Sequence, residues 1–142
     1  MTQIDIQLNL EKEVEIFQTA YGIDVVYPNM SYPNDDSTPV NGEDYIRISY
    51  INGDTFQREM GDAAQNRSFV IMQLDIFTSA GTGKATTKAI IDSLESYFYR
   101  GNVINNNGLN TRIIKFVSYT NNETTVNFNP FVQITTRTDY PN

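Results

Sequence analysis

Alternating hydrophobic and polar positions mark two strands in the middle of the chain. Residues 45–51 alternate between an apolar face and a mixed face, which is the pattern of a half-buried strand. Residues 68–77 form the clearest strand, because one face is wholly apolar while Gln73 and Asp75 interrupt the other. The apolar face consists of Val70, Met72, Leu74 and Ile76. This asymmetry predicts a central strand covered by helices on one side and partly exposed to water on the other.

Two segments have helical spacing instead. Residues 9–20 are predicted to form a helix, since the apolar stripe at Ile6, Leu10, Val14 and Phe17 has helical spacing. Residues 3–8 also alternate, so a strand and an extension of the helix both stay open there. A second helix follows the glycine-rich link at residues 81–83, and its stripe consists of Ile90, Ile91, Leu94, Tyr97 and Phe98. Gly22 and Gly101 stand where the two helices are expected to end.

The remaining segments are predicted to be further strands and their connections. The strands are expected at residues 23–27, 112–120 and 126–134. Asn52-Gly53 indicates a hairpin turn, followed by a short partner strand over residues 55–60. Residues 102–110 are predicted to be a polar loop. The Asn129-Pro130 break indicates an edge strand or a bulge, because proline cannot donate a ladder hydrogen bond.

A helix, strands, a second helix and further strands, in this order, are typical of an α+β fold. We expect a mainly antiparallel twisted sheet with two helices packed on one face. The chain has 142 residues, which is the usual length of one domain, so residues 1–142 are expected to form a single domain. Hydrophobic residues make up 39% of the chain, enough to fill a core without help from a metal or a disulfide.

The composition argues against several classes of function. The chain has no cysteine and no histidine, so thiolate zinc sites, cysteine nucleophiles and the commonest acid–base side chain are missing. The net charge is −7, and the ten Lys and Arg residues are scattered along the sequence, which argues against tight DNA binding. No signal peptide or membrane-spanning run is visible. These features favour a protein made in a cytoplasm that is not an enzyme.

Two motifs carry candidate chemistry, and each has a simpler explanation. The segment SAGTGKATT resembles a phosphate-binding loop, but Thr78 stands where the first glycine belongs, and Ala85 follows Lys84 in place of Ser or Thr. The acidic pairs Asp35-Asp36 and Glu43-Asp44 could bind a hard cation, but they lack calcium-loop spacing and fit a solvated loop better. We therefore expect no catalytic residue, no cofactor and no metal.

The segment from Pro28 to Asp44 is the strongest candidate for contact with a partner. It holds three of the five prolines, so no regular element is expected to run through it. Loops of this length are often functional, and tyrosines outside regular elements are favoured in interfaces. The candidate interface residues are Tyr32, Asp35, Asp36, Glu43 and Asp44.

From Tyr45 to Phe98 the order of features resembles the tail terminator-like proteins of long-tailed bacteriophages. The matching segments are YIRISYI, FVIMQLDIF, the glycine-rich link TSAGTGK and the amphipathic helix ATTKAIIDSLESYF. The N-terminal helix, the short strand, the proline-containing loop and the C-terminal pair of strands fit the same layout. The single residues that carry the resemblance are Arg47, Gln73, Asp75, Phe77, Gly81 and Gly83.

The resemblance implies a structural virion protein of the tail or neck that assembles into a ring, expected to be a hexamer. Such a ring caps the tail tube, stops its polymerisation and offers a docking surface to the head or neck. Its partners would be the tail tube protein and a head-completion or neck protein. DNA would pass through the lumen without specific binding, and no membrane would be contacted. Two alternatives stay open: another neck or head-completion protein, and a small nucleotide- or ligand-binding enzyme that uses Lys84.

Overall fold

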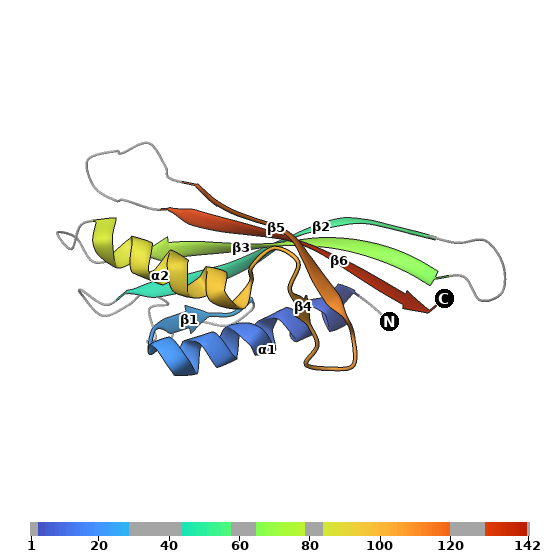
Figure 1. Ribbon diagram of the computed structural model, residues 1–142, viewed down its shortest axis with the longest axis horizontal. Coiled ribbons are helices and arrows are strands. Elements are labelled where there is room, and N and C mark those ends of the chain that lie inside the picture. Colours follow the sequence, from blue (N-terminus) through green and yellow to red (C-terminus); the bar gives the residue numbers. More distant parts are fainter. Residues whose placement is uncertain (1–2, 29–43, 58–64, 79–83, 120–129, 142) are drawn as a thin grey trace.

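A computed structural model of the chain has two helices on one side of a six-stranded sheet (Figure 1). The structure describes residues 3–28, 44–57, 65–78, 84–119 and 130–141. The helices and strands are, in chain order, α1 (Gln3–Tyr21), β1 (Asp24–Val26), β2 (Tyr45–Gln57), β3 (Gln65–Phe77), α2 (Lys84–Tyr97), β4 (Val103–Ile104), β5 (Thr111–Tyr119) and β6 (Phe131–Pro141). The predicted α+β fold is confirmed.

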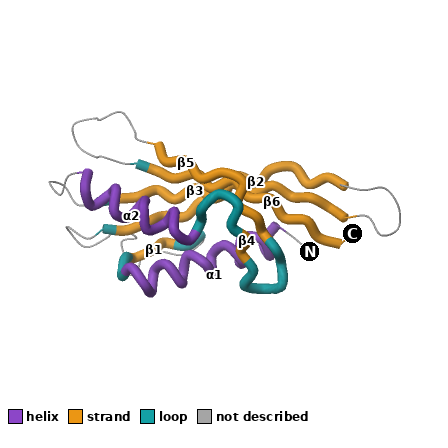
Figure 2. Tube along the Cα trace, in the orientation of Figure 1, coloured by secondary structure: helices purple, strands orange, loops and turns teal. Residues whose placement is uncertain are grey.

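The sheet has the strand order β1-β2-β3-β6-β5-β4. The short β1 pairs in parallel with β2, and the other neighbouring pairs are antiparallel. The strand β3 lies between β2 and β6, so the prediction of a central strand there is confirmed. Both helices lie against the same face of the sheet, which gives the molecule two layers (Figures 1 and 2).

The core lies between the helices and one face of the sheet. The apolar side of β3 (Val70, Met72, Leu74 and Ile76) is fully buried, as are Val132 and Ile134 of the neighbouring β6. The two helices bury Leu10, Phe17, Ile90 and Leu94 against this face. Since each such side chain contributes about 1.5–3 kcal/mol when removed from water, this single layer of contacts supplies most of the stability of the fold.

The first helix begins at Gln3, so the undecided residues 3–8 are helical. A strand would have pointed Ile4, Ile6 and Leu8 to the same side. In the helix Ile6 is fully buried, whereas Ile4 and Leu8 are 64% and 49% exposed. The helix ends as predicted at Gly22, which has a φ of 86° and whose N–H donates to the carbonyl of Gln18 at 2.8 Å.

The second helix also follows its prediction. Its stripe is buried at Ile90, Leu94 and Phe98, and the chain turns just beyond it at Gly101, which has a φ of 91°. The N–H of Gly101 donates to the carbonyl of Ile113 at 2.8 Å. This bond ties the end of the helix to β5, which helps to hold α2 over the sheet.

The predicted turn at Asn52-Gly53 is wrong. Strand β2 continues to Gln57, and its pairing with β3 shifts in register between Asn52 and Thr55, which is the mark of a β-bulge. An Asn-Gly pair suits a bulge as well as a turn, so the dipeptide alone does not distinguish the two. The expected separate strand at residues 55–60 is the far end of β2, paired to β3 over 55–57.

Two further expectations need correction near the C-terminus. Strand β6 is not an edge strand, because it lies between β3 and β5; Pro130 stands just before its first residue, where its carbonyl accepts the N–H of Ile76 at 3.0 Å. The expected polar loop at 102–110 contains β4 and buries Ile104 and Leu109. Polar composition misled here because the asparagines of this loop bond to the protein itself.

Candidate assembly surfaces

The sheet has a second face that the two helices leave uncovered. This open face consists of the odd-numbered residues 45–51 of β2, 67–77 of β3 and 131–139 of β6, together with Arg112, Lys115, Val117 and Tyr119 of β5. No helix in the described part of the chain lies on it (Figures 1 and 2). A sheet face that carries many apolar side chains and is covered by no helix among the described residues is suited to contact another chain.

Aromatic side chains gather at one end of the open face. Tyr45 and Phe77 stack across β2 and β3 with ring centroids 4.5 Å apart. Tyr119 and Phe131 stack across β5 and β6 at 4.9 Å. Tyr119 is 39% exposed. Stacked pairs of this kind are rigid and cost little conformational entropy on binding, so this end presents a preformed contact surface.

The middle of the open face carries a ladder of polar side chains beside apolar ones. The side-chain amide of Gln133 donates to Oε1 of Gln73 at 3.1 Å, and Nε2 of Gln73 donates to the Asp75 carboxylate at 3.0 Å. Next to this ladder Ile51 is 51% exposed, and Ile71 is its register partner on β3. The ladder fixes the orientation of its side chains, while the isoleucines supply apolar area.

Basic side chains that are scattered in the sequence come together on the open face. The described side chains of β2, β3, β6 and β5 include five basic residues, Arg47, Arg67, Arg112, Lys115 and Arg137, and two acidic ones, Asp75 and Asp139. The net charge of this set is therefore +3. Arg67 is paired with Asp139 at 2.8 Å.

Two of these arginines face each other across strands. Arg112 and Arg137 are register partners on β5 and β6, and like charges directly opposite each other are unfavourable in a sheet. Within the described residues no carboxylate forms an ion pair with either of them. This end of the open face is therefore suited to accept carboxylates from another chain.

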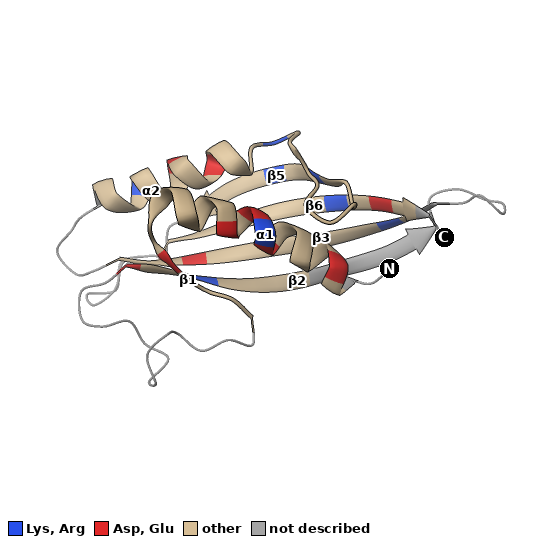
Figure 3. Ribbon diagram, turned by 90° about the horizontal axis from the view of Figure 1, so that it is seen from below, with Lys and Arg blue, Asp and Glu red and all other residues tan. Residues whose placement is uncertain are grey.

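The helical layer has the opposite charge. By sequence α1 and α2 contain six acidic and three basic residues, a net charge of −3. Figure 3 shows positions of both signs on the helices and on the strands, with acidic ones in excess on α1 and basic ones in excess along the sheet. The molecule is thus electrostatically two-sided, although its whole charge is −7.

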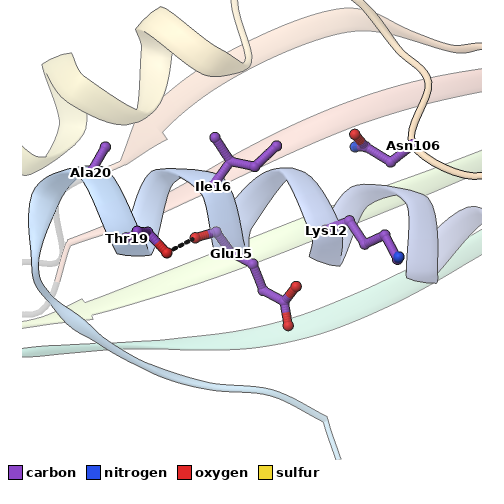
Figure 4. A pocket seen from close by; sticks show the side chains of 6 residues that line it. All are labelled: Lys12, Glu15, Ile16, Thr19, Ala20 and Asn106. Atoms are coloured by element: carbon purple, nitrogen blue, oxygen red, sulfur yellow. Dashed lines mark hydrogen bonds between the residues drawn. The ribbon is translucent and has the colours of Figure 1, made fainter.

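The outer side of α1 forms the second surface. Its exposed residues Ile4, Leu8, Lys12, Glu15 and Ile16, here called the α1 stripe, point away from the core. Part of the stripe borders a shallow groove of about 670 Å³. The groove is lined by Lys12, Glu15, Ile16, Thr19, Ala20 and Asn106 (Figure 4). Three large aliphatic side chains exposed on one helix side are unusual for a face that meets only water.

A cluster of acids and tyrosines joins α1 to β2 and β1. Burial raises the pKa of the Glu11 carboxyl; a hydrogen bond from Tyr50 opposes this shift, and the charge of Glu15 adds to it. Burial and the nearby Glu11 carboxylate raise the pKa of Tyr50 above its ordinary range. Burial and the charges of Glu15 and Glu11 raise the pKa of Tyr27 to about 12. The phenol of Tyr27 donates to Oε1 of Gln18 at 2.9 Å. These contacts hold the helix that carries the stripe in place.

A second polar connection fixes the other end of α1. Asn9 is fully buried, and its amide nitrogen donates to the Ile104 carbonyl at 2.9 Å and to Oγ1 of Thr111 at 3.0 Å. Its Oδ1 accepts the N–H of Asn106 at 2.7 Å. The Asn106 side chain in turn donates to the Glu13 carboxylate at 3.1 Å. The loop after β4 is therefore tied to α1, which makes the stripe and groove one rigid surface.

Most of the interface residues predicted from sequence cannot be placed. Tyr32, Asp35, Asp36 and Glu43 lie outside the described residues. Asp44 stands directly before β2 and borders a small depression of about 310 Å³. The sequence predicted the partly exposed side of β3 but did not mark it as a candidate interface, and it gave no prediction of the α1 stripe. The signal for the stripe was Ile4 and Leu8, two apolar residues that the helical stripe of the core does not need.

The described residues offer little for other chemistry. They contain no group of acidic side chains arranged to hold a metal ion, and none of the helices among them could cross a membrane. Lys84 is the first residue of α2, while Gly81 and Gly83 lie outside the described residues.

Comparison with known proteins first places the fold and then the family. A solved protein chain aligns with this one at a TM-score of 0.66 and 21% sequence identity, covering 100% of this chain and 99% of the other; this shows a shared fold. No curated protein sequence matched significantly. A family profile described as phage tail terminator protein matches residues 5–132. The chain therefore belongs to the phage tail terminator protein family, and the resemblance seen in the sequence is confirmed.

Proposed function

We propose that this tail protein forms a ring that caps the tail tube, stops its polymerisation and provides the surface on which the head or neck docks. Membership of the family makes the chain a structural component of a phage tail. The observation that carries the finer proposal is the open face, a sheet surface of aromatic, aliphatic and basic side chains that neither helix covers. A monomer has no use for such a surface.

A ring of identical subunits would meet its partners through different surfaces. Rings need two unlike surfaces that fit each other on neighbouring subunits, and the open face and the α1 stripe are unlike in shape and charge. We propose six copies in the ring, with the tail tube protein on one rim and a head-completion or neck protein on the other. DNA would pass through the lumen without being held, since the subunit charge of −7 repels phosphate.

The proposed role involves no catalysis. The chain lacks histidine and cysteine, and the glycine-rich link before Lys84 departs from the phosphate-binding motif. Binding and geometry alone can perform the task, because a ring that covers the end of the tube removes the surface on which the next tube subunit would add.

The test is a phage genome in which a stop codon interrupts this gene. We expect lysates to contain tubes of variable and excessive length without heads, as measured on negatively stained particles. A plasmid copy of the gene should restore uniform tails joined to heads. Tails of normal length that remain headless would assign a neck role instead, and normal joined tails would contradict both roles.

The segment from Pro28 to Asp44 supplies a second, local test. We propose that Tyr32, Asp35, Asp36, Glu43 and Asp44 contact the tube or the neck. Deleting residues 34–38 should leave the melting temperature unchanged but reduce head joining in the plasmid-rescue assay. The variant with Asp35→Asn and Asp36→Asn, which keeps the segment length, separates charge from length. Full joining by the deletion variant would remove this segment from the proposal.

A further inference from the structure

We propose that neighbouring copies of the chain associate in one direction, with the α1 stripe of one copy packed on the open face of the next. This rests on the proposed function, because a ring of this protein requires such a contact. The occupant of the open face would thus be a second copy of the same chain, which presents a helix to it. Three properties of the two surfaces support this inference: their exposed apolar side chains, their dimensions and their charges.

Both surfaces expose large apolar side chains. On the stripe Ile4, Leu8 and Ile16 are 64%, 49% and 49% exposed. On the open face Ile51 and Tyr119 are the most exposed large apolar side chains. A helix that lays spaced aliphatic residues on a sheet is the same packing that α1 and α2 use on the core face, so the fold already contains this type of contact.

The dimensions of the two surfaces also agree. The helix α1 has 19 residues, a length of about 28 Å. The four strands of the open face have 9 to 13 residues, so each extends for about 30–43 Å. Strands spaced about 4.8 Å apart give this face a plan area of roughly 600 Å², comparable with the surface of about 800 Å² that each partner buries in a stable interface.

Charge disfavours a contact between two open faces. The open face carries +3 among its described side chains, while α1 alone carries four acidic residues and one basic residue, a net charge of −3. Two open faces in contact would bring their basic residues together, whereas the α1 stripe itself carries one acid and one base, Glu15 and Lys12. Only the contact between unlike surfaces lets Glu15 approach Lys115 and the opposed arginines. The asymmetry therefore favours head-to-tail association, which closes into rings or continues as filaments.

The experiment uses two charge reversals, one on each surface. Glu15→Lys changes the stripe, Lys115→Glu changes the open face, and both side chains are exposed, so folding should persist and can be checked by circular dichroism. Light scattering at low salt measures the mass of the full chain, free and on purified tail tubes. Each variant alone should need about tenfold more protein to associate, because like charges then meet.

Mixing the two variants tests the direction of the contact. In an equimolar mixture each reversed stripe can meet a reversed open face, and each unchanged stripe an unchanged open face, so association should return to the wild-type midpoint. High salt should shrink the difference between the variants and the wild type. The matched controls Glu95→Lys and Arg100→Glu make the same charge changes at exposed positions outside both surfaces and should associate like the wild type.

Three outcomes overturn the inference: single variants that associate normally, a mixture no better than its components, or a wild-type chain that stays monomeric both free and on tubes. Tail length in rescued lysates separates these from failure of the proposed function. Uniform tails from poorly associating variants would support the proposed capping role and contradict the proposed contact between the α1 stripe and the open face. Variable tails despite normal association would support the proposed contact and contradict the proposed capping role.

Discussion

The two faces of the sheet are made by the same strands, yet they do different work. In β3 Leu74 points to the helices and is fully buried, while its neighbour Gln73 points to the open face and joins a ladder of side-chain hydrogen bonds. The core face is apolar and closed by α1 and α2. The open face is mixed, basic and closed by nothing among the described residues. The core face is thus closed by the subunit's own helices, whereas the open face is the one that we propose for contact with another chain.

The largest effect expected from this contrast is on stability. Leu74→Ala on the core face should lower the free energy of unfolding by about 3–4 kcal/mol, because it leaves a cavity under the helices. Ile71→Ala on the open face of the same strand should lower it by less than about 1 kcal/mol in dilute protein. Urea unfolding followed by circular dichroism measures both. Equal losses would show that the open face is part of the subunit core.

At the edge of the core, the buried side-chain amide of Asn9 ties α1 to the loop after β4. Asn9→Ala would leave the carbonyl of Ile104 and the N–H of Asn106 without their partner, so we expect a loss of about 2 kcal/mol. Asn107 is exposed; its side chain donates to the carbonyl of Asp5 and accepts the N–H of Leu109 at 3.3 Å. Since water can replace hydrogen bonds at an exposed position, Asn107→Ala should cost about 1 kcal/mol or less. Urea midpoints compare the two. Similar costs would mean that Asn9 is not what ties the loop to α1.

Sequence reasoning succeeded where periodicity reflects burial directly. The apolar side of β3 and the stripe of α2 were both predicted, because every second or every third to fourth residue faces the core. It failed where a short motif has two geometries, as at Asn52-Gly53, and where burial comes from distant partners. Asn9 bonds to residues 95 to 102 positions away, which no local pattern records.

The candidate site was harder to predict than the fold for a related reason. A candidate interface has no hydrophobic pattern of its own in the sequence. Its residues can be identified only after the positions that face the core are known. Tyr119, Arg112 and Arg137 come from separate strands, and only the pairing of those strands gathers them. The predicted interface at Tyr32, Asp35, Asp36 and Glu43 stays a prediction, since these residues lie outside the described ones.

Replacing one buried polar group in the core should raise the stability of the fold instead of lowering it. Thr87 on α2 is 3% exposed, and its hydroxyl has no hydrogen-bond partner among the described residues. Thr87→Val keeps the shape and removes the unpaired hydroxyl, so we expect a gain of about 1 kcal/mol. Thr86→Val, at a less buried position on the same helix, should change stability little. Thermal melting compares them, and a loss at Thr87 would reveal a partner for the hydroxyl.

The smallest expected effect concerns Glu11, whose side chain is partly buried at the edge of the core. Burial raises the pKa of its carboxyl in the folded chain, so folding favours the protonated form. The stability that protonated Glu11 contributes is therefore fully present below the pKa that its carboxyl has in the unfolded chain. It is lost as the pH rises through the pKa that the carboxyl has in the folded chain.

Glu11→Gln keeps an acceptor for Tyr50 but cannot ionise. It should raise the stability at neutral pH by a few tenths of a kcal/mol, since solvent screens a half-exposed group, and should add nothing near pH 4, measured from melting temperatures at both pH values. Glu95→Gln, at an exposed position on α2, is the matched control for the loss of one carboxylate. A larger gain at low pH would mean that the hydrogen bond from Tyr50 outweighs burial and that α1 is held to the sheet by a carboxylate instead of a carboxylic acid.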